Sequence, residues 1–298
     1  MLVPVIKNFR MVMRCILFIG VLLIWPYVKI DYAEILRNVG GLNENVAAIL
    51  MDISYKTLVF VITGIVLAVT DESKTIKIVA IVTAIVFAII AFVYGARGAL
   101  LSIAAFLLVF WIIKSKDKAS MNKRTIYSVI IIIFLVLLFV PVIMFSYDYL
   151  EAKGIEARSL ERIYYSISGN ESLSEGREFL YSKAKNGIAD SPFWGHGIGS
   201  FDNYSGVYPH NIILQLLYEG GIILAFPLLY ILCRGFISLF SFRYDQSYRF
   251  FMLLLFCSGI IELFLSSHLW MSIFFWLFIG QTLIRKKYIK NTVCQKNV

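Results

Sequence analysis

The stretch "IKIVAIVTAIVFAIIAFVY", Ile76–Tyr94, decides the fold class of this chain, because its only charged residue is Lys77. A helix of this length rises about 1.5 Å per residue, which is enough to cross a hydrocarbon core of about 30 Å. The stretch therefore predicts a transmembrane α-helix.

Apolar stretches of similar character recur along the sequence. The chain is 59% hydrophobic and only 16% charged, a composition that leaves too little polar surface for a soluble globule. We therefore predict an all-α fold, a polytopic transmembrane helix bundle of about eight spans. The predicted spans cover residues 12–30, 47–69, 76–94, 98–113, 126–146, 211–233, 249–267 and 269–284.

The basic residues predict the orientation of this bundle. The net charge is +9, and the basic stretches "KSKDKASMNKR", Lys114–Arg124, and "RKKYIK", Arg285–Lys290, fall on the same side of the predicted bundle. Lys and Arg are retained on the cytoplasmic side of short loops, so both termini are predicted to be cytoplasmic. Membrane topology then accounts for the charge, and we expect no nucleic-acid partner.

Three parts follow from this topology. Residues 1–146 are predicted to hold transmembrane helices 1 to 5. Residues 147–210 are predicted to form one large extracytoplasmic loop that contains short helices. Residues 211–298 are predicted to hold transmembrane helices 6 to 8 and a basic cytoplasmic tail.

The loop contains one clear helix signal, in "ESLSEGREFLYSKAKNG", Glu171–Gly187. Ser172 and Glu175 match a capping box, and Asn186-Gly187 is a favourable helix stop. We expect an amphipathic helix on the membrane surface between them. Its predicted apolar face consists of Phe179, Leu180, Ala184 and Ile188.

Charged residues inside the spans are candidates for function, because each costs at least about 2.5 kcal/mol in hydrocarbon. Asp52 and Lys56 are four residues apart on one helix face, which favours a mutual ion pair. Glu219 and Glu262 have no cation nearby in the sequence. Either a structural or a functional role is open for these two glutamates.

Two arginines stand out at predicted helix ends. Arg97 interrupts an apolar run in "YGARGALLS", where it could either snorkel to the interface or bind a lipid phosphate. Arg177 falls in the first turn of the predicted loop helix, which is an unfavourable end for a cation. This unfavourable position indicates that Arg177 has a functional partner.

A third group of candidates precedes the sixth predicted span, in "GHGIGSFDNYSGVYPHNIILQLLYEGG", Gly195–Gly221. Histidine can exchange protons near neutral pH, and His210 precedes Glu219 by about two helical turns. Gly195, Gly197 and Gly199 would let the backbone fold tightly against a ligand. They do not match a dinucleotide fingerprint, and the chain has neither a P-loop nor a D-x-D motif. We therefore expect no cofactor and no metal.

This ordered set of motifs resembles the O-antigen ligase and O-antigen polymerase superfamily. Its members carry R-G-A at a helix end, an arginine in the large loop, G-x-G-x-G-x-F, and H-N followed by a glutamate and a glycine. The corresponding residues here are Arg97, Arg177, Gly195, Gly197, Gly199, Phe201, His210, Asn211, Glu219 and Gly221. The resemblance covers residues 76–229 and implies a fold like that of class C glycosyltransferases. Members usually have about a dozen spans, so with eight we expect either an N-terminally shortened member or a fragment.

The resemblance also implies a chemistry. Such a protein is an enzyme of the bacterial inner membrane that transfers glycans from undecaprenyl-pyrophosphate by a metal-independent, inverting reaction. Arg97 and Arg177 would hold the leaving pyrophosphate, and either His210 or Glu219 would take the proton of the acceptor hydroxyl. Gly195, Gly197, Gly199 and Asn211 would bind the sugars.

Three functions remain open at this point. The first is a polymerase of lipid-linked repeat units for a surface polysaccharide such as O-antigen, capsule or exopolysaccharide, with a flippase and a chain-length regulator as partners. The second is a ligase that transfers the glycan to lipid A core or protein. The third is a transporter or binder without catalysis. The ligase-type motif ends in Gly, Thr or Tyr, whereas this chain has Leu224 there, which favours the polymerase.

Overall fold

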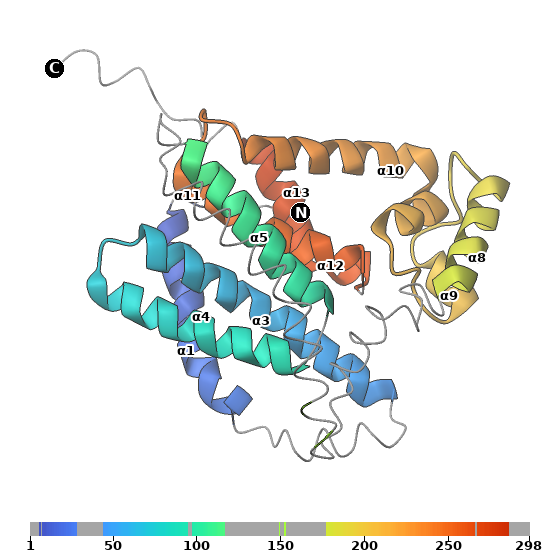
Figure 1. Cartoon of the computed structure of the whole chain (residues 1–298). Coiled ribbons are helices and arrows are strands. Elements are labelled where there is room, and N and C mark those ends of the chain that lie inside the picture. Colours follow the sequence, from blue (N-terminus) through green and yellow to red (C-terminus); the bar gives the residue numbers. More distant parts are fainter. Residues whose placement is uncertain are drawn as a thin grey trace, which may run out of the picture. The chain divides into compact units, whose positions relative to one another are not determined.

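The computed structural model describes residues 6, 8–28, 44–94, 97–116, 149, 152, 177–265 and 267–285. Every regular element within these ranges is a helix (Figure 1). The first four are α1 (Phe9–Val28), α3 (Glu44–Thr70), α4 (Lys74–Tyr94) and α5 (Arg97–Lys116). The later ones are α8 (Arg177–Asp190), α9 (Ser200–Ser205), α10 (Ile212–Ser238), α11 (Gln246–Leu255), η1 (Phe256–Ile260), α12 (Ile261–Leu263), η2 (Leu269–Met271) and α13 (Ile273–Ile284).

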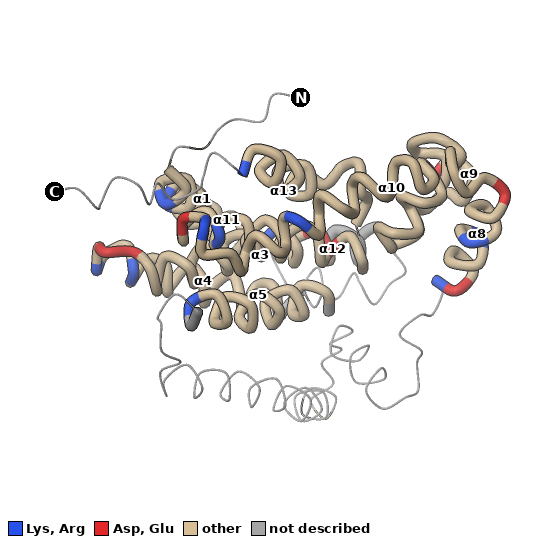
Figure 2. Tube along the Cα trace, turned by 90° about the horizontal axis from the view of Figure 1, so that it is seen from above, with Lys and Arg blue, Asp and Glu red and all other residues tan. Residues whose placement is uncertain are grey.

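Five of the described helices are long and apolar enough to cross a membrane. These candidate spans are Phe9–Tyr27, Met51–Thr70, Lys74–Phe92, Ile212–Ser238 and Gln246–Leu263, and two shorter apolar helices cover Gly98–Lys114 and Ile273–Ile284. Charged residues gather near helix ends and on α8 (Figure 2). The all-α membrane fold is therefore confirmed. The predicted span at 126–146 lies outside the described residues.

The chain divides into two compact units, residues 11–175 and residues 1–10 with 176–298. In the first unit, α3 and α4 form an antiparallel pair whose backbones approach closely at Gly64. A Cβ atom there would lie 2.6 Å from the carbonyl oxygen of Ala80 and 2.8 Å from Cβ of Ala84. Small residues permit such contacts between membrane helices. Helix α5, which begins at Arg97, packs on α3 through Ala99 against Tyr55 and Leu58.

An ion pair joins α1 to the turn between α3 and α4 in this unit. The Arg14 guanidinium of α1 donates to both carboxylate oxygens of Asp71, at 2.8 and 2.9 Å. Asp71 also accepts from the Ser73 backbone N–H at 2.9 Å. The bond from Arg14 holds the pKa of the Asp71 carboxyl below its usual range. The predicted Asp52–Lys56 pair is likewise confirmed, with 2.5 Å between Lys56 Nζ and Asp52 Oδ2.

In the second unit, α8 and α13 pack against α10. Helix α8 begins at Arg177, within the predicted loop helix, but the predicted end and apolar face were partly wrong. The helix continues through Gly187 to Asp190. Gly187 instead permits a close contact with α10, since a Cβ built there would lie 2.2 Å from Cε2 of the Tyr218 ring. Phe179 is 69% exposed, because only the stripe at i, i+4 and i+8 faces α10. That stripe consists of Leu180, Ala184 and Ile188.

Candidate functional site

Helix α10 is the element on which the candidate site is built. It is preceded by Asn211, whose side-chain oxygen accepts from the backbone N–H groups of Ile213 and Leu214, at 2.9 and 3.2 Å. Asn211 is therefore an N-cap. Sugar binding by this residue, as the resemblance implies, stays a prediction.

Ten residues after Asn211, α10 is interrupted. Gly221 has φ 59° and ψ −167°, a conformation open to glycine alone. In a regular helix, the carbonyls of Tyr218 and Glu219 would accept from Ile222 and Ile223. The break at Gly221 leaves these four backbone groups without their helical partners.

The loop that precedes α9 occupies this gap and supplies the missing partners. The backbone N–H groups of His196 and Gly197 donate to the carbonyls of Tyr218 and Glu219, at 2.9 and 2.8 Å. In return, the N–H groups of Ile222 and Ile223 donate to the carbonyls of Pro192 and Phe193, at 2.9 and 3.3 Å. Loop and helix thus complete each other's hydrogen bonds, as polar backbone at membrane depth requires.

Two glycines allow this close approach. A Cβ atom on Gly195 would lie 2.5 Å from the carbonyl carbon of Glu219. One on Gly221 would lie 2.2 Å from the carbonyl oxygen of Phe193. Gly197 and Gly199 also have positive φ, at 99° and 76°, but open space surrounds the Cβ position of both. The three predicted glycines therefore differ in their structural roles.

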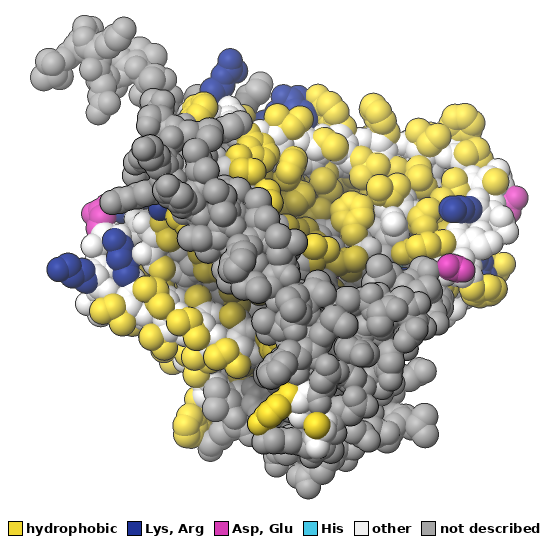
Figure 3. Space-filling view, viewed as in Figure 1, with side chains coloured by type: hydrophobic (Ala, Val, Ile, Leu, Met, Phe, Trp, Pro, Cys, Tyr) yellow, Lys and Arg dark blue, Asp and Glu magenta, His cyan; other side chains and the backbone are white. Residues whose placement is uncertain are grey.

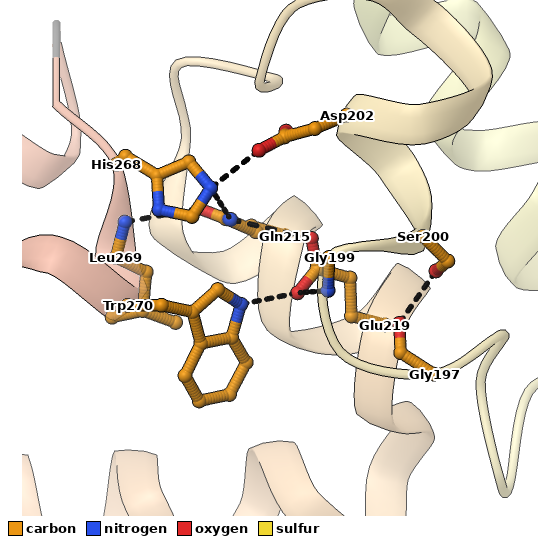
Figure 4. A network of polar contacts seen from close by, with 9 residues as sticks. All are labelled: Gly197, Gly199, Ser200, Asp202, Gln215, Glu219, His268, Leu269 and Trp270. Atoms are coloured by element: carbon orange, nitrogen blue, oxygen red, sulfur yellow. Dashed lines mark hydrogen bonds and ion pairs between the residues drawn. The ribbon is translucent and has the colours of Figure 1, made fainter.

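Glu219 lies at the centre of a polar network beneath this loop (Figure 4). It is 1% exposed. Its Oε2 accepts from the Gly199 backbone N–H at 3.0 Å and from the Trp270 indole N–H. Its Oε1 accepts from the Gln215 amide at 3.3 Å. Three donors from separate parts of the unit thus hold one buried carboxylate, as such a group requires.

A histidine and an aspartate extend the network (Figure 4). His268 Nε2 lies 2.5 Å from Asp202 Oδ2 and 3.5 Å from Gln215 Nε2. The amide nitrogen of Gln215 can only donate, so His268 Nε2 cannot serve both neighbours, and the shorter contact indicates that it donates to Asp202. The buried Nδ1 of His268 has no partner among the described residues. A carboxylate that fixes one imidazole nitrogen and leaves the other open is an arrangement suited to proton transfer.

His210 lies at the entrance to α10 in a strained conformation. Its φ is 51°, the only positive value among the described non-glycine residues. Its ring lies 4.3 Å from that of Tyr208, and its buried Nδ1 has no partner within the described part of the chain. Burial, and secondly the positive charge of Arg177, lower the pKa of His210 to about 4. His210 is therefore neutral at pH 7.

The two predicted arginines lie in different units. Arg177, the first residue of α8, is close enough to His210 for its charge to act on the imidazole. The structure thus brings Glu219 together with Gly199, and it places His210 within range of the charge of Arg177. Arg97 begins α5 in the other unit, and its side chain is not among those described.

Sequence reasoning missed Asp202, Gln215 and Trp270. Gln215 carried a usable signal, because it lies four residues before Glu219 on the same face of an apolar helix. Trp270 and Asp202 carried none, since their partners lie far away in the sequence. His268 carried no signal beyond its position directly before the last predicted span.

No group of three or more His, Cys, Asp or Glu residues that could hold a metal occurs in the described ranges. The fold and this site define a polytopic helical membrane protein, with a polar network where a loop enters a broken helix.

Residues 82–229, about half of the chain, match the protein family described as O-Antigen ligase. The chain therefore belongs to the O-antigen polymerase and ligase superfamily. Neither the curated proteins nor the solved structures contain a match to it. The matched region includes all eight predicted site residues. The family implies a membrane glycosyltransferase-like enzyme whose substrates are lipid-linked glycans and membrane lipid.

Proposed function

We propose that this protein polymerises undecaprenyl-pyrophosphate-linked repeat units into a surface polysaccharide at the outer face of the bacterial inner membrane. The observation that carries the proposal is a neutral His210 at the entrance to α10, within range of the positive charge of Arg177 and inside the region matched by the family. A cation near a proton acceptor is what the reaction needs.

The chemistry follows from these two groups. An acceptor sugar hydroxyl attacks the anomeric carbon of the donor, and the bond from that carbon to the pyrophosphate oxygen breaks with inversion. The hydroxyl proton passes to His210, and Arg177 stabilises the negative charge of the departing pyrophosphate. The proposal that Arg97 assists Arg177 rests on the sequence motif.

The surroundings of the two candidate bases favour His210 over Glu219. Glu219 accepts hydrogen bonds from Gly199, Trp270 and Gln215. These donors occupy both oxygens of the carboxylate, so we assign Glu219 the role of a positioning residue. His210 keeps a nitrogen without a partner among the described residues.

The donor itself would strengthen this base. Part of the lowered pKa of His210 comes from the charge of Arg177. A pyrophosphate bound to Arg177 would offset that charge and raise the pKa again. The imidazole would then become a better proton acceptor when the donor is in place.

Reconstitution into liposomes with a lipid-linked repeat unit tests the proposal. The wild type should give a ladder of longer glycans. His210→Gln should lose about 10²- to 10⁴-fold in turnover, as expected for a general base. Arg177→Ala should lose about 10²- to 10³-fold, as expected when a group that stabilises the transition state is removed.

Arg243→Ala is the matched control, because Arg243 is an exposed arginine beyond the Ser238 end of the same helix. This variant should keep full activity. Transfer to lipid A core without any lengthening of the repeat unit would contradict the polymerase and establish the ligase. Binding of the repeat unit without any transfer would instead indicate a binder or transporter.

A further inference from the structure

The loop that fills the break in α10 carries large apolar side chains on its surface. Phe193 is 62% exposed, Trp194 77% and Ile198 67%. No Asp, Glu, Lys or Arg occurs from Ser191 to Phe201. A loop in water seldom exposes three such side chains within six residues without a charge beside them.

The hydrogen bonds to α10 fix where this loop lies along the helix. Ile222 and Ile223 donate to the carbonyls of Pro192 and Phe193, and Gly221 meets the Phe193 carbonyl directly. The loop is therefore held level with Gly221. The depth of Gly221 in the membrane is also the depth of Phe193.

The segment of α10 that follows the break limits that depth. From Gly221 to Ser238 it rises about 26 Å, which is about 4 Å less than a hydrocarbon core of about 30 Å. If the core ends at Ser238, Gly221 lies about 4 Å inside its opposite boundary. If Ser238 lies beyond the core, Gly221 lies deeper.

Helix α8 selects the shallower position. It packs on Leu214 and Tyr218 of α10 while it carries exposed charged residues such as Glu178 and Lys185. Charges of this kind stay out of hydrocarbon. The first two turns of α10 therefore lie at the headgroup level, and Gly221 lies just below it.

Exposed apolar side chains also occur on α10 directly after the break. Ile222, Ile223 and Phe226 directly follow the break and are 47%, 50% and 70% exposed. Hydrophobic side chains cover much of the visible face of the molecule over α10 (Figure 3). Since α10 is a candidate span, acyl chains suit this stripe as its cover. The exposed side chains of the loop lie at the same level of α10.

We infer that Pro192–Ile198 is a membrane-inserted anchor, in which Phe193, Trp194 and Ile198 contact lipid at the boundary between headgroups and acyl chains. Aromatic side chains concentrate in this layer of membrane proteins. The surface is distinct from the proposed reaction, since it needs only the depth of α10 and the contacts of the loop. Through Gly199 and Glu219 it would also fix the depth of the polar network in the bilayer.

Spin labelling in liposomes tests this inference without any activity measurement. In a variant whose four cysteines are replaced, one label is placed by Trp194→Cys. A lipid reference is placed by Phe226→Cys, and a water reference by Lys185→Cys, at an exposed residue of α8. Collision of each label with oxygen, which concentrates in lipid, is compared with its collision with a water-soluble nickel complex.

The label at position 194 should resemble the one at 226, with a high ratio of oxygen to nickel collisions, and should differ clearly from the one at 185. Ile198→Cys gives a second reporter should the first variant misfold, and the same result is expected there. A ratio at 194 and 198 equal to that at 185 would overturn the inference and leave the loop in water. Neither result depends on whether the protein polymerises glycans.

Discussion

At the scale of single residues, the site depends on groups whose ordinary properties are altered by their neighbours. His210 combines a left-handed backbone, a buried nitrogen and a nearby arginine. Such strain persists only where the surroundings hold it. These surroundings keep the His210 imidazole neutral at pH 7.

We expect a titration of His210, monitored through the NMR signals of labelled histidine, to give a pKa of about 4. Arg177→Gln should raise that pKa, because it removes the second cause of the shift while burial remains. Arg243→Gln should leave it unchanged. Signals of the other two histidines are identified by His196→Gln and His268→Gln. An identical pKa in the wild type and Arg177→Gln would contradict the pairing of Arg177 with His210.

The glycines of the loop allow a second test, because two of them, Gly195 and Gly199, have a similar positive φ but different space around the Cβ position. Gly199→Ala meets only the left-handed φ, which costs about 1 to 2 kcal/mol. Gly195→Ala adds a collision with the Glu219 backbone, so its cost should be about 3 kcal/mol or more. Thermal unfolding of both variants in detergent measures the difference. Equal losses of stability in the two variants would contradict the close contact between Gly195 and α10.

At the scale of elements, the structure shows which parts of the sequence pattern were informative. The apolar runs predicted α1, α3, α4, α5 and α10 because a helix that long has few alternatives in a membrane. They could not predict the break at Gly221. The conformation of Gly221 depends on hydrogen bonds to the carbonyls of Pro192 and Phe193, which lie about thirty residues earlier in the sequence.

The same limit explains the uneven prediction of the site. Glu219 and His210 were singled out because a buried charge and a histidine at a helix entrance are unusual in themselves. Trp270 and Asp202 are ordinary residues until the fold brings each beside its partner. Phe179 was wrongly assigned to the packed face of its helix. The apolar character of a residue does not by itself indicate which face of the helix packs against another element.

An element-scale prediction concerns the turn between α3 and α4. Asp71→Asn should lower the thermal unfolding midpoint at neutral pH, because it removes the charge that pairs with Arg14. Glu72→Gln removes a charge from the next residue, which is exposed, and should have a much smaller effect. Differential scanning in detergent compares the two.

The pH dependence of this effect has a definite sign. The pKa of Asp71 is lowered in the folded protein, so the pair stabilises the fold above the usual carboxyl pKa. That stability is lost as the pH falls through the lowered value. The wild type and Asp71→Asn should therefore converge in acid. A constant difference at every pH would show that the ion pair is not the cause.

At the scale of the whole molecule, the membrane and the lipid-linked substrate decide which reaction conditions matter. Arginine is the group proposed to carry the charge of the leaving pyrophosphate. Extension of a lipid-linked repeat unit should therefore continue in EDTA, and Mg²⁺ should not increase the rate. Product ladders with and without the chelator give the comparison. Loss of the ladder in EDTA and its return with Mg²⁺ would contradict the proposed mechanism.

The shared hydrogen bonds of the loop and α10 also have a consequence for how the chain is made. The ribosome synthesises Pro192–Gly197 before it synthesises Tyr218–Ile223, so the docking segment exists first. When the broken helix leaves the insertion machinery, its free carbonyl and amide groups can be satisfied at once by a segment that is already waiting. Biogenesis of this helix would then depend on a partner encoded upstream of it, and a break that would be costly for an isolated helix becomes the position at which two parts of one chain find their register.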